Sequence, residues 1–115
     1  MIYSINEIKT LIEPIAIEYN LPAVYLFGSY ARGDATDNSD IDFLIDDNNS
    51  TLKSLFDIGG LFDDMMKVLS KKIDIVSING LMSGTHKVDI MMRNEILNER
   101  VLIYDQKRLS GIDAH

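Results

Sequence analysis

The segment AVYLFGSYARGDATDNSDIDFLI, residues 23–45, decides the fold because it holds two predicted strands and the polar turn between them. The apolar run 23–27 ends at Gly28 and predicts a short buried strand. Residues 39–46 alternate with a period of two, which predicts a second strand. Its core face carries Ile41, Phe43 and Ile45, and its other face carries Asp40, Asp42 and Leu44.

Outside this segment, apolar periodicity predicts three helices and two further strands. Ser4 and Glu7 have the spacing of a capping box and begin the first helix, which Pro14 should kink or divide. The later elements are a helix over 51–70, a strand over 71–78, a loop over 78–84, a helix over 85–99 and a strand over 100–104. Helices and strands alternate, which favours a mixed α and β class.

The two long C-terminal helices have predicted apolar stripes. The stripe of 51–70 consists of Leu52, Leu55, Phe56, Phe62, Met66 and Leu69. In the helix over 85–99 the residues expected to face inward are Val88, Met91, Met92 and Ile96. Both stripes predict the sides that pack on the sheet.

The composition limits the classes of protein to consider. With 115 residues and 46% hydrophobic residues, we expect one domain over 1–115, with a core over about 20–104 and a polar tail over 105–115. The absence of cysteine excludes disulfides and thiolate metal sites. The net charge of −7 argues against a broad grip on nucleic acid. Because no run of about 18 apolar residues occurs, we expect no membrane span and a cytoplasmic protein.

Three aspartates are candidate metal ligands. Asp40 and Asp42 are two residues apart on a predicted strand, so their carboxylates point to the same side and repel each other. Bound Mg²⁺ would make that arrangement favourable, because carboxylate oxygens are suitable ligands for it. Asp74 lies between two isoleucines, where a carboxylate is costly unless it is paired or metal-bound. A strand–helix–strand connection can bring Asp74 beside the other two.

Simpler interpretations of these aspartates stay open at this point. Asp40 and Asp42 can form a solvated acidic edge. Asp74 can pair with Lys71 or Lys72. The spacing of the first two and the apolar surroundings of the third favour a metal site.

The turn after the first strand has the groups that phosphates need. Gly28 lets an anion approach exposed backbone N–H groups closely. Ser29 can donate its hydroxyl hydrogen, and Arg32 can neutralise phosphate charge. Together with the aspartates, this turn predicts a site for metal-assisted transfer of a phosphate-containing group.

These residues resemble a known signature. Gly28-Ser29, ten further residues and Asp40-Ile41-Asp42 form G-S-x10-D-x-D, which resembles the signature of the DNA polymerase β-like nucleotidyltransferase superfamily. The string GSYARGDATDNSDIDFLI and the ending IMMRNEILNERVLIYD are similar to its minimal nucleotidyltransferase (MNT) branch. The resemblance covers roughly residues 20–104. It implies a polymerase β-like α+β fold, with a small mixed β-sheet flanked by helices.

The resemblance also implies roles for individual residues. Catalysis and the binding of two Mg²⁺ ions would fall to Asp40, Asp42 and Asp74, and nucleotide binding would fall to Gly28, Ser29 and Arg32. MNT proteins often form a toxin–antitoxin pair with a HEPN-domain partner. The MNT antitoxin transfers AMP from ATP to a tyrosine of the HEPN ribonuclease toxin and silences it. The resemblance thus implies an Mg²⁺-dependent protein adenylyltransferase whose partners are ATP and a HEPN toxin, with no nucleic acid or membrane.

Other functions are compatible with the sequence. A nucleotidyltransferase can act on a small molecule such as an aminoglycoside, or on an RNA end, but the predicted elements leave no second domain for an acceptor pocket. A non-catalytic antitoxin could cover a basic ribonuclease surface by contact alone, and the net charge of −7 is compatible with that.

Overall fold

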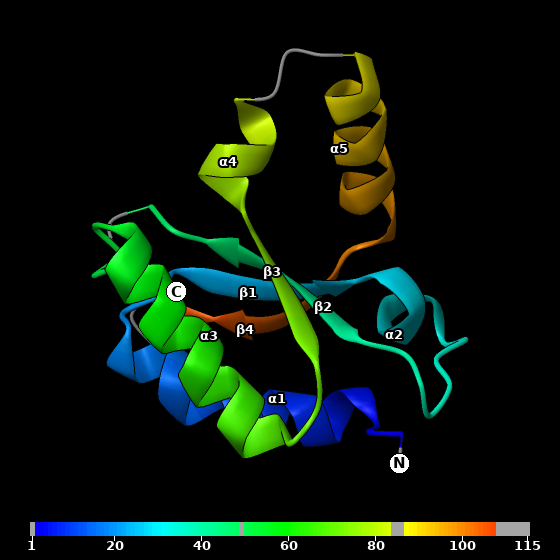
Figure 1. Cartoon of the computed structure of the whole chain (residues 1–115), viewed down its shortest axis with the longest axis horizontal. Coiled ribbons are helices and arrows are strands. Elements are labelled where there is room, and N and C mark those ends of the chain that lie inside the picture. The colour runs from blue at the N-terminus through cyan, green and yellow to red at the C-terminus, as the bar shows by residue number, and fades with distance from the viewer. Residues whose placement is uncertain (1, 49, 84–86, 108–115) are drawn as a thin grey trace.

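The computed structural model describes residues 2–48, 50–83 and 87–107, which form a four-stranded sheet with helices on both faces (Figure 1). The elements in chain order are α1 (Ile5–Glu18), β1 (Ala23–Phe27), α2 (Gly28–Arg32), β2 (Ile41–Asp46), α3 (Leu55–Leu69), β3 (Ile73–Ser77), α4 (Ile78–Met82), α5 (Lys87–Glu99) and β4 (Val101–Asp105). The predicted α+β class with a small mixed sheet is confirmed.

The order of the strands positions the candidate site. The sheet runs β3–β2–β1–β4, with β1 antiparallel to β2 and β4, and β2 parallel to β3. Because β1 and β2 are antiparallel, the end of β1 lies beside the start of β2, and Phe27 stands opposite Asp42. The parallel pair needs a crossover connection, which α3 provides. The turn at Gly28 is therefore next to the acidic residues at the start of β2.

Helix α1 begins with the predicted capping box. Ser4 Oγ accepts a hydrogen bond from the Glu7 backbone N–H at 3.1 Å, and Glu7 Oε1 accepts one from the Ser4 N–H at 2.8 Å. An N-cap of this type contributes about 1 kcal/mol. Helix α1 continues through Pro14, so the helix is not divided there. Pro14 is exposed, and its ring therefore displaces no core side chain.

The main core lies between the sheet and the helices α1 and α3 (Figure 1). The three side chains that the alternation placed on the core face, Ile41, Phe43 and Ile45, are fully buried in it. A smaller core on the other face joins Leu44 to Phe27, Leu81 and Ile96, beneath α4 and α5. Both faces of β2 are therefore covered, except near its N-terminal end.

The prediction of a loop over 78–84 is wrong for residues 78–82, which form the short helix α4. Ser77 Oγ accepts a hydrogen bond from the Gly80 N–H at 3.0 Å and caps this helix. In α5, Ile96 is buried as predicted, but Met91 and Met92 are exposed. The side chain of Val88 lies outside the described residues. Helix α5 packs on α2 and α4 rather than along the sheet, so only part of its apolar stripe is covered.

The predicted apolar stripe of α3 is partly wrong. Among the described side chains of α3, the buried ones are Leu61, Met65 and Leu69, which are four residues apart and form one face of the helix. The side chain of Leu55 lies outside the described residues. Phe56 and Met66 are exposed instead. Helix α3 is continuous through Gly59 and Gly60, although glycine disfavours a helix interior. Across the described ranges, no helix combines the length and the apolar character that crossing a membrane requires.

Candidate active site

The chain turns sharply where β1 ends and α2 begins. Gly28 has a φ of +71°, in the left-handed region that glycine adopts without strain. A Cβ atom at this position would overlap Oδ2 of Asp42. Both the backbone conformation and the close approach of Asp42 therefore require glycine, and the turn lies directly against that carboxylate.

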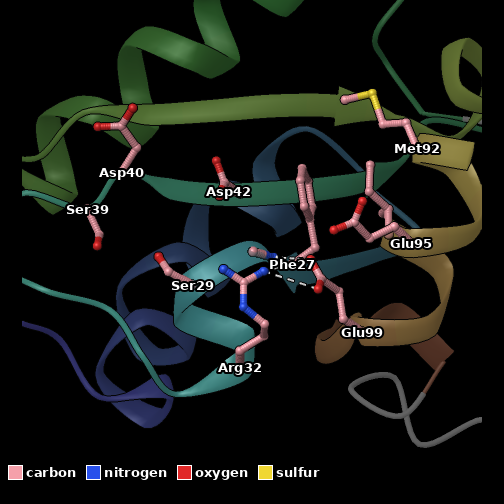
Figure 2. A pocket seen from close by; sticks show the side chains of 11 residues that line it. Phe27, Ser29, Arg32, Ser39, Asp40, Asp42, Met92, Glu95 and Glu99 are labelled. Atoms are coloured by element: carbon pink, nitrogen blue, oxygen red, sulfur yellow. Dashed lines mark hydrogen bonds and ion pairs between the residues drawn. The ribbon is translucent and has the colours of Figure 1, made fainter. Parts of the chain in front are cut away.

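A pocket of about 430 Å³ opens beside this turn. Five of the six site residues predicted from the sequence line it, namely Gly28, Ser29, Arg32, Asp40 and Asp42. In Figure 2 the guanidinium of Arg32 points into the pocket, and the side chains of Asp40 and Asp42 extend from β2 and the residues just before it. The structure thus brings together the glycine–serine turn, the positively charged side chain of Arg32 and the carboxylates of Asp40 and Asp42.

Asp74 does not line this pocket, but it lies on the neighbouring strand and is paired with Asp42 in the β2–β3 register. Residues paired in this way present their side chains on the same face of the sheet. Among the described residues, Asp74 forms no ion pair with Lys71 or Lys72. Lys71 Nζ instead donates a hydrogen bond to the backbone carbonyl of Asp37 at 2.9 Å. The third aspartate therefore lies next to the other two, outside the pocket itself.

Asp42 is electrostatically strained by these neighbours. Its partial burial, together with the negative charges of Asp74 and Asp40, raises the pKa of its carboxyl group to about 6. The positive charge of Arg32 opposes this effect. The ionised form of Asp42 is thus disfavoured by desolvation and by like charges.

Asp40, Asp42 and Asp74 have the oxygen donors that suit a magnesium ion. No three His, Cys, Asp or Glu side chains in the part of the chain that the structure describes are already grouped to hold a metal ion. Asp40 and Asp74 are exposed, so their side chains have room to rotate toward Asp42. A divalent cation would replace the repulsion that raises the pKa of Asp42 with attraction, and oxygen donors suit Mg²⁺.

Glu99, the last residue of α5, also belongs to the site, although no sequence pattern indicated it. Glu99 Oε1 accepts a hydrogen bond from the Gly28 backbone N–H at 2.8 Å, and Glu99 Oε2 lies 3.2 Å from Arg32 Nη1. Glu95 and Met92 of the same helix also line the pocket. No local pattern could have revealed them, because they reach the site only through the packing of α5 over the turn.

The glycine–serine turn follows one strand, two aspartates lie at the start of its antiparallel neighbour, and a third lies on the strand beyond. This is the arrangement that the sequence resemblance to nucleotidyltransferases implied. The sequence model of the family described as Polymerase beta, Nucleotidyltransferase matches residues 9–109. The chain belongs to this family, as the sequence resemblance implied.

Individual relatives agree with this assignment. The chain is 35% identical over 98 residues to MJ0435 of Methanocaldococcus jannaschii, a proposed protein adenylyltransferase, and the match covers 85% of this chain and 96% of the relative. The family and this relative support an enzyme that transfers a nucleotidyl group.

Two solved structures have a similar fold. One is a toxin–antitoxin crystal structure with AMP-PNP, with a TM-score of 0.66, 19% identity and coverage of 90% of this chain and 78% of that one. The other is a proposed minimal nucleotidyltransferase, with a TM-score of 0.65, 24% identity and coverage of 86% of this chain and 95% of that one. At these identities the structures support the fold alone.

Proposed function

We propose that the chain is an Mg²⁺-dependent protein adenylyltransferase that acts as an antitoxin. It transfers AMP from ATP to a tyrosine hydroxyl of a HEPN ribonuclease toxin and thereby neutralises the toxin. The observation that carries this proposal is the close approach of the Gly28 backbone to the Asp42 carboxylate. It puts a turn suited to phosphates beside a carboxylate suited to a metal.

Three residues of the turn are proposed to bind the triphosphate. The backbone at Gly28 lets a phosphate approach closely, Ser29 donates its hydroxyl hydrogen, and Arg32 contributes its positive charge. All three line the pocket, as do two of the aspartates. The triphosphate and the carboxylates would therefore meet in one place.

The aspartates are proposed to hold the metal. Asp40, Asp42 and Asp74 would bind two Mg²⁺ ions, which when bound supply positive charge for the triphosphate and lower the pKa of the acceptor hydroxyl. In the transfer, a bond forms between the tyrosine oxygen and the α-phosphorus, and the bond from the α-phosphorus to the bridging oxygen breaks. Pyrophosphate leaves with the electron pair, and Asp74 or solvent takes the hydroxyl proton.

A protein acceptor suits the architecture best. The pocket lies at one end of the sheet, beside α2 and α5, and the sheet and its helices account for the described chain. An acceptor protein brings its own hydroxyl group and needs no binding domain in this chain. The relative MJ0435, a proposed protein adenylyltransferase, supports the same acceptor class.

The test is the transfer of label from [α-³²P]ATP with Mg²⁺ to the purified HEPN toxin. Wild-type protein should label the toxin, and changing the toxin's acceptor tyrosine to phenylalanine should remove the label. Asp42→Asn should reduce transfer about a hundredfold or more. Asp63→Asn, which removes an exposed carboxylate on α3, should retain transfer.

The other outcomes separate the rival functions. Transfer by Asp42→Asn at the wild-type rate would contradict the role of the metal. Label on an RNA end or on an aminoglycoside, but not on the toxin, would change the acceptor. Protection against the toxin by Asp40→Asn in cells would indicate an antitoxin that acts by contact.

A further inference from the structure

Glu99 contacts two of the groups that are proposed to bind the triphosphate. Its Oε1 accepts the Gly28 N–H at 2.8 Å, and its Oε2 lies 3.2 Å from Nη1 of Arg32 (dashed lines in Figure 2). The Glu99 side chain is 18% exposed and the Arg32 side chain is 46% exposed, so the carboxylate is the more shielded partner. Charge-assisted hydrogen bonds, rather than burial of the guanidinium, hold the geometry of this pair.

The position of Glu99 is unfavourable for the helix that carries it. Glu99 is the last residue of α5, where the aligned peptide dipoles make the helix end negative. The last turn of α5 contains no basic residue that would offset a carboxylate. The Gly28 N–H and Arg32 therefore compensate the charge of Glu99, and the contact serves the turn rather than the helix.

The contacts of Arg32 leave part of its guanidinium available. Nε lies 3.3 Å from Asp34 Oδ2, and Nη1 lies within 3.4 Å of both carboxylate oxygens of Glu99. Nη2 has no hydrogen-bond partner among the residues that the structure describes. Since a guanidinium has five N–H donors in one plane, two carboxylates fix that plane while the donors of Nη2 remain for a phosphate.

We propose that Glu99 is a positioning residue for nucleotide binding. It fixes the left-handed turn at Gly28 and the plane of Arg32 before the triphosphate arrives. This inference rests on the proposed function, because it takes the triphosphate to bind at this turn. Groups that are already ordered lose less conformational entropy on binding, which increases affinity.

A competing role for Glu99 predicts the opposite result. If its carboxylate were an internal anion that competes with the triphosphate for Gly28 and Arg32, removal of the carboxylate would tighten nucleotide binding. If Glu99 only stabilised the fold, its removal would lower the melting temperature and leave the affinity of the folded protein unchanged.

The test is calorimetric binding of α,β-methylene-ATP with Mg²⁺ to the full chain. Glu99→Ala removes both contacts and should weaken binding about tenfold. Glu99→Gln keeps an oxygen acceptor for the Gly28 N–H and should bind within about threefold of the wild type. Glu18→Ala is the matched control, because it removes an equal charge from the last residue of another helix, α1, where Glu18 is exposed and does not line the pocket. It should not weaken binding.

A second measurement needs no nucleotide. The Gly28 amide proton, hydrogen-bonded to a carboxylate, should move upfield in the NMR spectrum of Glu99→Ala and much less in that of Glu99→Gln. The Arg32 Nε–H signal should broaden in the alanine variant and be retained in the glutamine variant. These signals report the order of the turn and of the guanidinium directly.

Each outcome decides the proposal. Weaker binding by Glu99→Ala with recovery in Glu99→Gln supports it, whereas tighter or unchanged binding by Glu99→Ala overturns it. An unchanged chemical shift of the Gly28 amide proton in Glu99→Ala also overturns it. If the wild type does not bind the probe although the amide responds, the proposed function is wrong and the inference falls with it.

Discussion

Replacing Asp42 by asparagine should stabilise the protein although it removes the proposed metal ligand. Partial burial and the charges of Asp74 and Asp40 raise the pKa of the Asp42 carboxyl from 3.8 to about 6. A pKa difference of this size corresponds to a free-energy difference of about 3 kcal/mol between the ionised and protonated forms of Asp42. Asp42 is only partly buried, so solvent screening reduces the expected effect to about 1 kcal/mol. The melting temperature of Asp42→Asn should then be higher by about 4 °C at neutral pH.

The pH dependence identifies the cause. A carboxyl group with a raised pKa holds its proton more tightly in the native state than in the unfolded chain. The wild type therefore loses stability as the pH rises from about 4 to about 6, and the loss is complete above that range. Asparagine does not titrate there. The two proteins should be equally stable near pH 4 and differ most above pH 7.

The assay is thermal unfolding followed by circular dichroism in chelator, at several pH values between about 4 and 8. Asp63→Asn removes an exposed carboxylate of α3 and controls for the change in net charge. Added Mg²⁺ should raise the melting temperature of the wild type and not that of Asp42→Asn. An Asp42→Asn protein that is less stable than the wild type at neutral pH, or a gap that is the same at every pH, would refute the electrostatic reasoning.

Three further substitutions test the packing around the site and the core. Gly28→Ala should lower the free energy of unfolding by about 2 kcal/mol or more in urea titrations, because its φ is +71° and its Cβ would overlap Asp42 Oδ2; unchanged stability would contradict this. Tyr19→Phe should cost about 1 kcal/mol, since the Tyr19 hydroxyl donates to Asp64 Oδ2 at 2.7 Å. Tyr30→Phe should be neutral or stabilising by the same measurement, because the buried Tyr30 hydroxyl has no partner among the described residues. Equal losses in both tyrosine variants would argue against this difference.

The sequence predicted the parts of the fold that depend on local pattern. The strand at 23–27 has the bounds of β1, and the alternation through Ile41, Phe43 and Ile45 identified the buried face of β2. The expected position of Asp74 beside Asp42 was also correct, since the two residues are paired in the β2–β3 register. The reason given for it was wrong, because Asp74 is exposed and its carboxylate is not in the core. These features depend on side-chain period and local chemistry.

The features that the sequence did not reveal depend on how distant elements pack. Met91 and Met92 have helical spacing but are exposed, since α5 leaves the sheet and covers only the pocket end. Glu99 reaches Gly28 across most of the chain, and no neighbour in the sequence indicates the pairing. Helix α4 depends on its cap at Ser77. The segment has Gly80 at its centre, and glycine disfavours helices, so the sequence did not predict a helix there.

The register between β1 and β2 links the geometry of the candidate site to the packing of the core. One pairing places Phe27 opposite Asp42 and, at the same time, Ile41 and Phe43 in the main core. A slip by a single residue would exchange the two faces, so that the aspartate would be buried and the largest apolar side chains would be wetted. A slip by one residue is therefore incompatible with the main core. The pairing that buries Ile41 and Phe43 also sets the spacing between the turn and the acidic pair.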